Sequence, residues 1–507
     1  MHERQTLKRI VIVGGGTAGW MAAAAFAKVL GPRYAVHLVE SEEIGTVRVG
    51  EATVPHLRRF NDLLEIDEAE FVRQVQGTFK LGIQFRDWGR IGDNYIHGFG
   101  KLGHDIGPLA FHQFWIKAQL RGIARPLNDY SINTAAAVLG KFMPSSSDAP
   151  ANSPLADVHY AYHFDAGLYA RYLRGYAEKR GVRRTEGKIA HVHLHPERGD
   201  VTAVQLENGT RIEGDLFVDC SGFRGLLIEQ ALHTGYEDYT PWLFCDRAVA
   251  MGCTTAGPPT PYTRVSAREA GWQWRIPLQH RTGNGYVYAS RHISDDEASA
   301  RLVASLDGAP LGEPRLLRFT PGRRRKFWNR NVVALGLASG FLEPLESTSI
   351  FLIQSGIARL LAVLPWNDFS PVVQDEYNAQ LAFEIERIRD FLILHYHATQ
   401  RDDTPLWREC ARMEIPQHLA HRIRLFQDSG LVFYECNEMF AELSWVQVMI
   451  GQNLMPRGYH PLVDQMSEQD LAHFIRGVGQ VVDSCAEMMP PHQAFIDRYC
   501  AAPGLNP

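Results

Sequence analysis

Runs of apolar residues divide the first forty positions into a strand, a turn, a helix and a second strand. A β-branched run over residues 10–13 leads into a glycine turn over 14–19, and an alanine-rich stretch over 21–27 follows. A second apolar run over 36–39 ends at Glu40. A short buried strand, a glycine turn and a helix predict the opening of a βαβ unit that binds a dinucleotide.

The glycine turn consists of Gly14, Gly15, Gly16, Thr17, Ala18 and Gly19. In this pattern the first glycine permits a tight bend, the second lets the backbone approach a pyrophosphate, and the last lets helix and strand pack closely. The helix N-terminus offers N–H groups to the phosphates. Glu40 stands about twenty residues further on, where an acidic side chain binds a ribose hydroxyl. A turn that only changes the chain direction would not explain Glu40.

The rest of the pattern predicts a mixed α/β chain with a discontinuous nucleotide-binding core. Helices are expected over 56–64, 68–76, 111–121 and 162–180, and strands over 78–85, 189–195, 201–207, 215–222 and 332–340, with long loops within 89–155. From residue 371 the chain is mostly helical. We therefore expect a nucleotide-binding core with an inserted β-sheet and loops over 1–370, and a helical region over 371–507 that completes the substrate site.

Composition narrows the class of protein without identifying its chemistry. The 507 residues are 45% hydrophobic and 21% charged, as in a globular protein. A net charge of −5 gives no reason to expect nucleic acid as a partner. Seven cysteines without a Cys-x-x-Cys pair favour reduced thiols in the cytoplasm. The apolar run after Lys8 and Arg9 stops at the glycine turn and predicts a core strand rather than a signal peptide, and no apolar stretch is long enough to span a membrane.

Some residues suggest chemistry but also have structural explanations. Lys80 stands among aromatic and aliphatic neighbours, so it is either a desolvated, reactive amine or a lysine that extends from a strand edge to water. The run 347–349 reads Ser-Thr-Ser and is more often a helix cap than an anion site. Trp272 and Trp274 alternate along a strand and could simply pack in the core. The basic run 323–326 suggests a solvated hairpin edge.

Two other classes of site are not supported. His395 and His397 are two residues apart on an expected helix and point to different sides, and neither a His-Glu-x-x-His motif nor a cysteine-rich site occurs. A Gly-x-Ser-x-Gly nucleophile motif is also missing. We therefore expect neither a metal site nor a hydrolase.

Four segments resemble the flavin-dependent halogenases of the tryptophan halogenase family, in that family's order. They are the glycine turn, residues 49–55 with Phe79-Lys80-Leu81-Gly82, the motif Trp272-x-Trp274-x-Ile276-Pro277, and Pro344-Leu345-Glu346-Ser347-Thr348. The tryptophan motif separates these halogenases from flavin monooxygenases. The resemblance implies an FAD-binding, Rossmann-like core of the flavin monooxygenase type with an added helical C-terminal region.

The resemblance also implies a reaction and its participants. FADH2 from a separate flavin reductase reacts with O2, and a chloride or bromide ion held at Thr348 and Ser349 is oxidised to hypohalous acid. Lys80 receives this oxidant, and Glu346 polarises it or takes the ring proton. Trp272 and Trp274 shield the flavin from the organic substrate. FAD would contact the whole glycine turn and six further residues, namely Glu40, Val49, Ala52, Ile189, Leu337 and Ile350.

The substrate end departs from the tryptophan-specific members of the family. His97, Phe99 and Trp445 resemble the aromatic walls that hold an indole. Phe433 stands where those members have a tyrosine, and Phe440 stands where they have an acidic residue. Without these polar groups free tryptophan should bind poorly, so we expect indole or an indole derivative.

Other functions stay open on the sequence. The alternatives are halogenation of free tryptophan, hydroxylation of an aromatic ring by a flavin monooxygenase, and a non-catalytic FAD-binding protein. A homodimer is one possibility for the assembly.

Overall fold

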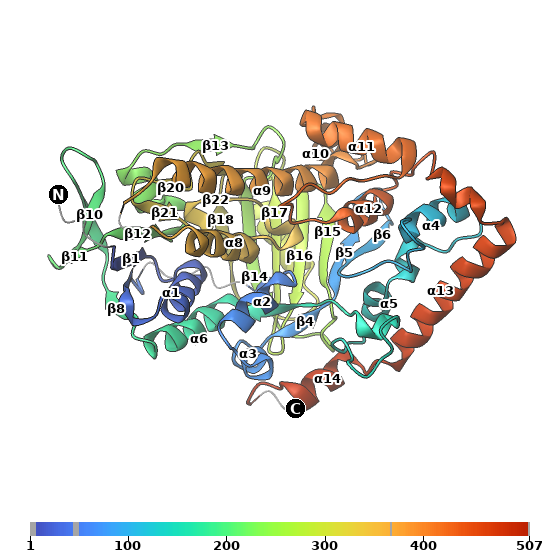
Figure 1. Ribbon diagram of the computed structural model, residues 1–507, viewed down its shortest axis with the longest axis horizontal. Coiled ribbons are helices and arrows are strands. Elements are labelled where there is room, and N and C mark those ends of the chain that lie inside the picture. Colours follow the sequence, from blue (N-terminus) through green and yellow to red (C-terminus); the bar gives the residue numbers. More distant parts are fainter. Residues whose placement is uncertain (1–6, 44–49, 366–367, 505–507) are drawn as a thin grey trace. The chain divides into compact units, whose positions relative to one another are not determined.

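The computed structural model (Figure 1) describes residues 7–43, 50–365 and 368–504, and these form two compact units. Unit 1 comprises Met1–Gln76, Phe164–Pro241 and Phe319–Ile385, and unit 2 comprises Gly77–His163, Trp242–Arg318 and Glu386–Pro507. This division follows a different line from the expected one at residue 370. Residues 77–163 and 242–318 group with the C-terminal helices rather than with the glycine turn.

Unit 1 is built on a six-stranded sheet that confirms the predicted Rossmann-like core. Its order is β20 (Trp328–Asn329), β21 (Val332–Ala334), β12 (Leu216–Asp219), β1 (Arg9–Val13), β2 (Ala35–Glu40) and β8 (Arg183–Glu186). All neighbours are parallel except β20 and β21. Val13 lies opposite both Val39 and Asp219, so the carboxyl ends of the three central strands meet at one edge, where nucleotides bind in such sheets.

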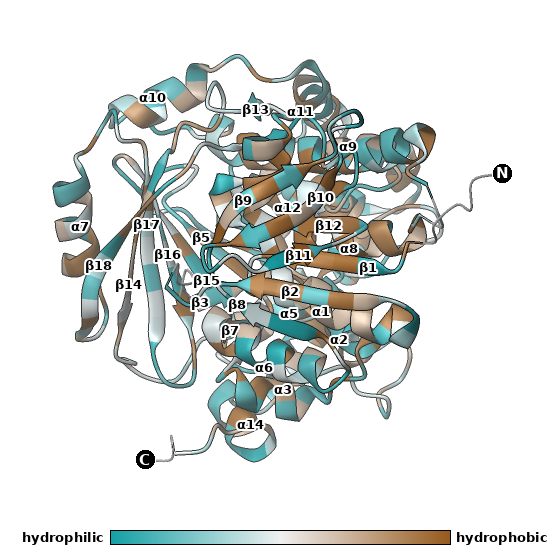
Figure 2. Ribbon diagram, turned by 90° about the vertical axis from the view of Figure 1, so that its left-hand side faces the viewer, coloured by the Kyte–Doolittle hydropathy of each residue, from teal (hydrophilic) through white to brown (hydrophobic). Residues whose placement is uncertain are grey.

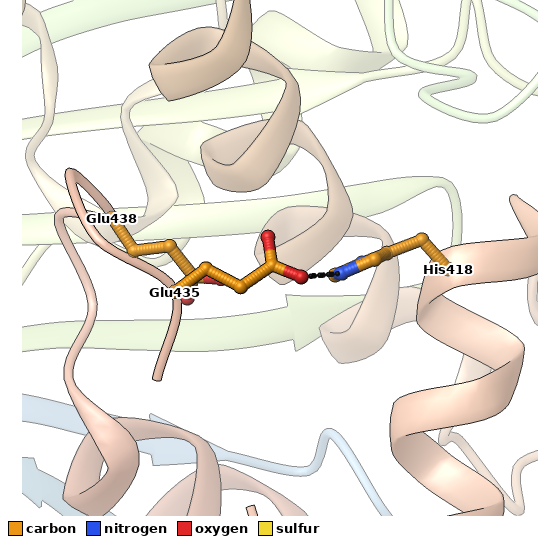
Figure 3. Close-up of side chains that lie close together, drawn as sticks. All are labelled: His418, Glu435 and Glu438. Atoms are coloured by element: carbon orange, nitrogen blue, oxygen red, sulfur yellow. Dashed lines mark hydrogen bonds and ion pairs between the residues drawn. The ribbon is translucent and has the colours of Figure 1, made fainter. Parts of the chain in front are cut away.

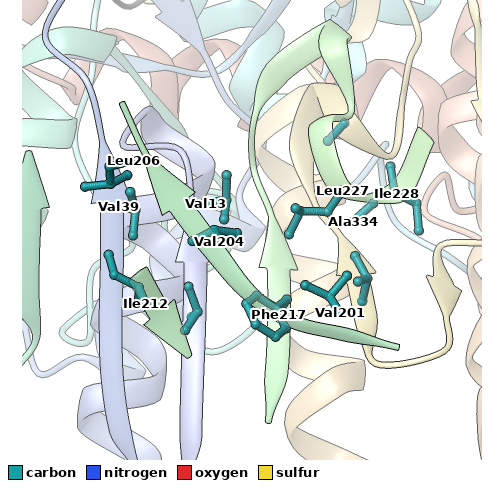
Figure 4. Packing of buried hydrophobic residues seen from close by; sticks show 13 residues of the cluster. Val13, Val39, Val201, Val204, Leu206, Ile212, Phe217, Leu227, Ile228 and Ala334 are labelled. Atoms are coloured by element: carbon teal, nitrogen blue, oxygen red, sulfur yellow. The ribbon is translucent and has the colours of Figure 1, made fainter. Parts of the chain in front are cut away.

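Alternating side chains bury both faces of this sheet, and Figure 2 shows its central strands as largely hydrophobic. One face carries Val13, Val39 and Phe217, which pack against a small antiparallel sheet of β9 (Ile189–Leu194), β10 (Val201–Leu206) and β11 (Arg211–Glu213) (Figure 4). On α1 (Thr17–Leu30) the run from Gly19 to Phe26 is fully buried, and this helix packs against α6 (Ala166–Glu178) and α8 (Ser349–Ala362).

The basic run is not the solvated edge that the sequence suggested. Arg323 and Arg324 are buried in β19 (Gly322–Arg324), the middle strand between β13 (Tyr236–Asp238) and β22 (Gly340–Phe341). Burial is tolerated because each guanidinium is paired: Arg323 with Glu237 at 2.7 Å and Arg324 with Glu229 at 2.7 Å. Only Arg325 and Lys326 are exposed.

The remaining elements of unit 1 are β3 (Gly50–Ala52), α2 (His56–Leu63) and α3 (Glu68–Gln74). Helix α9 (Pro371–His397) begins in unit 1 and ends in unit 2.

Unit 2 contains a seven-stranded sheet and a set of helices. The strand order is β18 (Pro310–Arg318), β14 (Arg247–Cys253), β17 (Thr282–Tyr288), β16 (Gly271–Pro277), β15 (Thr263–Arg268), β5 (Gly82–Arg86) and β6 (Asn94–Gly98). The helices are α4 (Phe111–Leu120), α5 (Ile132–Val138), α7 (Asp295–Ala304), α10 (Pro405–Arg412), α11 (Gln417–Ser429), α12 (Glu442–Gly451), α13 (Glu468–Met488) and α14 (His492–Tyr499). In the part of the chain that the structure describes, no helix is both long and apolar enough to cross a bilayer.

Two predicted elements are divided. The strand expected over 78–85 is split into β4 (Thr78–Lys80), which pairs with β7 (Ala161–Asp165), and β5, which belongs to the large sheet. The split falls at Leu81, whose N–H donates to the carbonyl oxygen of Pro261 and whose carbonyl oxygen accepts from the N–H of Phe99. The helix expected over 162–180 begins only after β7, because the Asp165 carboxylate accepts a hydrogen bond from the N–H of Leu168 and caps α6.

The buried arginine predicts a stability difference between two neighbouring residues. Arg324→Ala removes the partner of Glu229 and a hydrogen bond to the carbonyl of Ala338 at 3.1 Å, and should lower the free energy of unfolding by about 2–4 kcal/mol. Arg325→Ala, next to it but exposed, should change it by less than about 0.5 kcal/mol. Urea unfolding followed by circular dichroism measures both, and equal effects would contradict the assignment.

Candidate functional site

The turn between β1 and α1 leaves open space beside the first residues of a helix. A Cβ on Gly14, which has a φ of +109°, would lie 2.3 Å from the carbonyl oxygen of Cys220, and one on Gly19 would lie 1.9 Å from the carbonyl oxygen of Gly14. A Cβ on Gly16 would meet nothing within 4 Å. Helix α1 has no side-chain cap and no acidic residue in its first turn, so its N–H groups remain available to an anion. The turn therefore fits the pyrophosphate of a dinucleotide.

Glu40 lies beside this turn, as the sequence predicted for a ribose ligand. A Cβ on Gly15 would lie 1.4 Å from the Glu40 Oε2, so the carboxylate occupies the place of a side chain at the turn. Its Oε1 accepts a hydrogen bond from Arg184 Nε at 2.5 Å. The arginine fixes the carboxylate in position and leaves its second oxygen toward the turn.

The second turn, after β12, is organised by the buried carboxylate of Asp219. It accepts hydrogen bonds from the N–H of Ser221 at 3.0 Å and from those of Leu227 and Ile228 at 2.7 and 2.8 Å. Gly222 follows with a φ of +73° and open space beside it. Asp219 therefore shapes the backbone of this turn, and its carboxylate is already used by N–H groups.

The third turn, after β21, approaches the first one. A Cβ on Gly336 would lie 2.8 Å from the Cβ of Ala18, which places the neighbouring Leu337 close to the start of α1. The other residues expected at the cofactor are Ala52, buried in β3, Ile350, buried in α8, Ile189, which packs on the core from β9, and Val49, which is outside the described residues.

Thr348 stands at the start of α8 but does not cap it. It occupies the N-cap position, as predicted, yet its side chain makes no capping hydrogen bond. The hydroxyl is fully buried and has no hydrogen-bond partner among the described residues. Ser347 before it adopts a left-handed conformation with a φ of +60°, and Glu346 is buried in the preceding turn Pro344–Glu346. A buried hydroxyl beside an uncapped helix start is suited to an anion that accepts hydrogen bonds.

Lys80 is a fully buried lysine in unit 2. It ends β4, opposite Ala161 of β7, and its side chain has no exposed surface. Its Nζ lies 5.4 Å from the centre of the Phe99 ring, and that ring is partly exposed. This geometry excludes the alternative of a lysine that reaches water from a strand edge, and it brings two of the predicted residues together.

Trp272 and Trp274 lie side by side on β16, as the alternation predicted. Their ring centres are 6.0 Å apart, and both side chains are buried. Gly285 on β17 lies opposite Trp274, and a Cβ there would lie 2.1 Å from the indole. The glycine therefore makes room for this ring.

His97 and Trp445 both lie against the ring of Phe391. Phe391 lies 5.7 Å from His97 and 4.8 Å from Trp445, measured between ring centres. Phe440 stacks on the same Phe391 at 4.0 Å, and so fills space rather than offering a polar group. Helix α12, which carries Trp445, is tied to β6 by two hydrogen bonds between Gln447 and Gly98 at 3.0 and 3.2 Å.

A buried ion pair packs against the ring of Trp445. The Arg422 guanidinium lies 4.3 Å from the ring centre of Trp445 and binds both oxygens of Glu438, at 3.0 and 2.6 Å. Glu438 also lies near Glu435 and His418 (Figure 3), where His418 Nε2 is 2.8 Å from Glu435. Asp390 and then Glu435 raise the pKa of His418. Because Arg422 already neutralises Glu438, this group is an ion-pair network, and we assign no metal to it.

The structure thus places the predicted residues in two sets. Those expected at the cofactor and halide, with Glu346, belong to unit 1, and those expected at the substrate, with Lys80 and the two tryptophans, belong to unit 2. Sequence reasoning missed the roles of Phe391, Arg422 and Glu438 around Trp445. The Arg and Glu are sixteen residues apart, and no local pattern marks them as partners.

Comparisons with known proteins show which proteins this chain is similar to. The tryptophan halogenase family profile matches residues 9–468. A tryptophan 6-halogenase from Streptomyces toxytricini is 37% identical over 455 residues, which are 84% of this chain and 86% of that protein. A flavin-dependent halogenase structure from Xanthomonas campestris is 52% identical with a TM-score of 0.95, covering 98% of this chain and 99% of its own. Another, from Brevundimonas sp. BAL3, is 45% identical with a TM-score of 0.94 and covers 99% of both chains.

The open space over Gly16 allows a test of the cofactor site. Gly16 has a φ of −74°, which alanine adopts without strain, and the added methyl meets no protein atom within 4 Å. Gly16→Ala should therefore keep the melting temperature and weaken FAD binding at least about 10-fold, which is about 1.4 kcal/mol, in a fluorescence titration. Gly175→Ala, at another glycine with open space but inside α6, is the control. Unchanged FAD affinity in Gly16→Ala would place the pyrophosphate elsewhere.

Proposed function

This chain belongs to the tryptophan halogenase family of flavin-dependent halogenases, and we propose that it uses FADH2 and O2 to chlorinate or brominate indole or an indole derivative. The observation that carries the proposal is the fully buried Lys80 against the Phe99 ring, in a chain whose glycine turn fits a dinucleotide.

FAD would be held by the first turns of unit 1. The N–H groups at the start of α1 would bind the pyrophosphate over Gly16, and Glu40 would bind a ribose hydroxyl. The turns at Gly222 and Leu337 would approach the rest of the cofactor. When bound in its reduced form, the flavin supplies the electrons for a balanced conversion: FADH2, O2, a halide ion and a proton give FAD, hypohalous acid and water.

The halide would lie at the start of α8. Thr348 offers a buried hydroxyl without a partner among the described residues, and the first N–H groups of this 14-residue helix lack a side-chain cap. A desolvated chloride or bromide needs such donors. Ser349 would add a further hydroxyl and N–H group.

Lys80 and Glu346 would carry the halogenation itself. The amine of Lys80 either donates a hydrogen bond to hypohalous acid or forms a haloamine with loss of water. The carboxylate of Glu346 either polarises the oxidant or accepts the proton that the ring loses when the halogen is added. Overall, an aromatic C–H bond is replaced by a carbon–halogen bond, and hypohalous acid becomes water. The tryptophan pair on β16 would fill space near the flavin and keep the substrate away from it.

Indole suits this site better than free tryptophan. His97, Phe99 and Trp445 would contact the rings, and an offset-stacked ring gains about 0.5–1.5 kcal/mol beyond burial. Phe440 packs on Phe391 and has no polar group. The carboxylate of Glu438 is paired with Arg422, so neither residue can bind the ammonium group of an amino acid. The relative from Streptomyces toxytricini is a tryptophan 6-halogenase, which makes free tryptophan the second candidate.

The proposal includes a partner and a compartment. A separate flavin reductase would supply FADH2 by diffusion, because the sequence contains no recognisable nicotinamide site. The enzyme would work in the cytoplasm on a small aromatic compound, without nucleic acid or a membrane. The homodimer remains a prediction.

Replacing the amine of Lys80 should separate flavin chemistry from halogenation. Lys80→Met keeps the length and apolar stem and should retain FAD binding and O2 consumption, while brominated and chlorinated indole fall at least about 100-fold by mass spectrometry. Lys101→Met, at an exposed lysine of the same unit, is the control. Full retention of halogenation would falsify the role of Lys80. Oxygen incorporation into the ring in the presence of bromide, without brominated product, would instead indicate a monooxygenase.

Competition between indole and L-tryptophan tests the substrate class. We expect kcat/KM for indole to exceed that for tryptophan at least about 10-fold, because the zwitterion would lose the hydration of its charged groups without gaining protein partners. Phe440→Glu should reduce this preference, whereas Leu462→Glu, at an exposed residue of the same unit, should leave it unchanged. A preference of the unaltered enzyme for tryptophan would rule out the indole assignment.

A further inference from the structure

Two buried histidines bond to the two residues that precede Lys80. Thr78 and Phe79 form β4 together with Lys80. The Thr78 hydroxyl lies 2.9 Å from His163 Nδ1, and the N–H of Phe79 donates to His492 Nε2 at 3.2 Å. All of these residues belong to unit 2.

The hydrogen bonds of Thr78 determine which nitrogen of His163 carries the proton. The hydroxyl has one proton, and it donates this proton to the carbonyl oxygen of Pro277 at 2.7 Å. It must therefore accept the bond from His163, so Nδ1 of that ring bears a hydrogen. The other nitrogen, Nε2, lies 2.8 Å from the hydroxyl of Thr263 and accepts from it when the ring is neutral.

His492 is fixed in the same tautomer. Its Nδ1 lies 2.8 Å from the carbonyl oxygen of Pro259, which can only accept, so this nitrogen carries the hydrogen. Its Nε2 is then free to accept from the N–H of Phe79. A second hydrogen on Nε2 would oppose that N–H group, so the bond to β4 requires the neutral ring.

The surroundings keep both rings neutral. Burial lowers the pKa of His163 well below its ordinary value. Burial also lowers the pKa of His492 to about 4. At neutral pH both rings therefore keep the hydrogen-bonding pattern described above.

We propose that His163 is a positioning residue that fixes the end of β4, and with it the amine of Lys80, through the hydroxyl of Thr78. The imidazole joins β7 to β4 on one side and to β15 on the other, and Thr78 continues the connection to Pro277 at the end of β16. The short strand β4 has only three residues, so these side-chain bonds add to the few that its backbone makes. This inference rests on the proposed role of Lys80 in receiving the oxidant.

Two substitutions of His163 separate its two bonds. Asparagine places its amide N–H where Nδ1 lies, so His163→Asn retains the bond to Thr78. Glutamine places its terminal group where Nε2 lies, so His163→Gln retains only the bond to Thr263. Thr78→Val removes the same bond from the other side. Thr263→Val, which removes the second hydroxyl on this imidazole, is the matched control.

Loss of the Thr78 bond should reduce turnover rather than substrate binding. In His163→Gln and Thr78→Val we expect kcat for indole halogenation to fall about 10- to 100-fold, since small displacements of a reacting group have effects of this size, with KM changed by less than about 2-fold. His163→Asn and Thr263→Val should stay within about 3-fold of the unaltered enzyme. Without flavin, amide hydrogen exchange at residues 78–81 should be faster in His163→Gln than in His163→Asn.

The outcomes distinguish this inference from the function on which it rests. Equal kcat in the Asn and Gln variants, whether high or low, would overturn the positioning role, because general packing does not discriminate between the two nitrogens. A fall in kcat for Thr263→Val as large as for Thr78→Val would also overturn it. If Lys80→Met itself retained halogenation, the proposed function would fail instead.

Discussion

Complete burial of the Lys80 side chain is the constraint on which the candidate site depends. An amine placed away from water is costly when it is charged, and a lysine has a long stem with which to reach solvent. The fold removes that alternative by ending β4 at Lys80, by placing Phe99 beside the amine and by bonding both preceding residues to neutral histidines. On our proposal, this burial keeps the amine reactive, because its surroundings offer little water to solvate a charge.

Much of unit 1 could be predicted because its signals are local. A strand, the turn over 14–19 and helix α1 follow one another directly, and the acidic end of β2 lies at the distance this motif requires. Even so, local rules gave the wrong surroundings for two features. The basic run over 323–326 is half buried. Its partners Glu229 and Glu237 lie far away in the chain, so the local sequence did not reveal the pairing. Thr348 has the N-cap position but not the capping bond, which leaves its hydroxyl for another partner.

The surroundings of Lys80 could not be predicted in the same way. Its apolar neighbours Phe79 and Leu81 are adjacent in sequence, but His163 is 85 residues from its partner Thr78 and His492 is 413 residues from Phe79. Such pairs depend on strand register and on where the last helices pack, and a single sequence records neither. The strand expected over 78–85 shows the same limit, because its first part pairs with β7 and its second part with β15, both distant in the chain.

The ion pair that packs against Trp445 bears on the proposed preference for indole over tryptophan. The Arg422–Glu438 pair is buried and bidentate, so breaking it to bind another ion would leave a charge without its partner, at a cost of about 3–5 kcal/mol. A substrate ammonium group would have to offset that cost before it gained anything. On our proposal, an uncharged indole avoids this cost, because it brings no ammonium group that would compete with Arg422 for Glu438. The ion pair packs against Trp445 and, on our proposal, also disfavours amino acids.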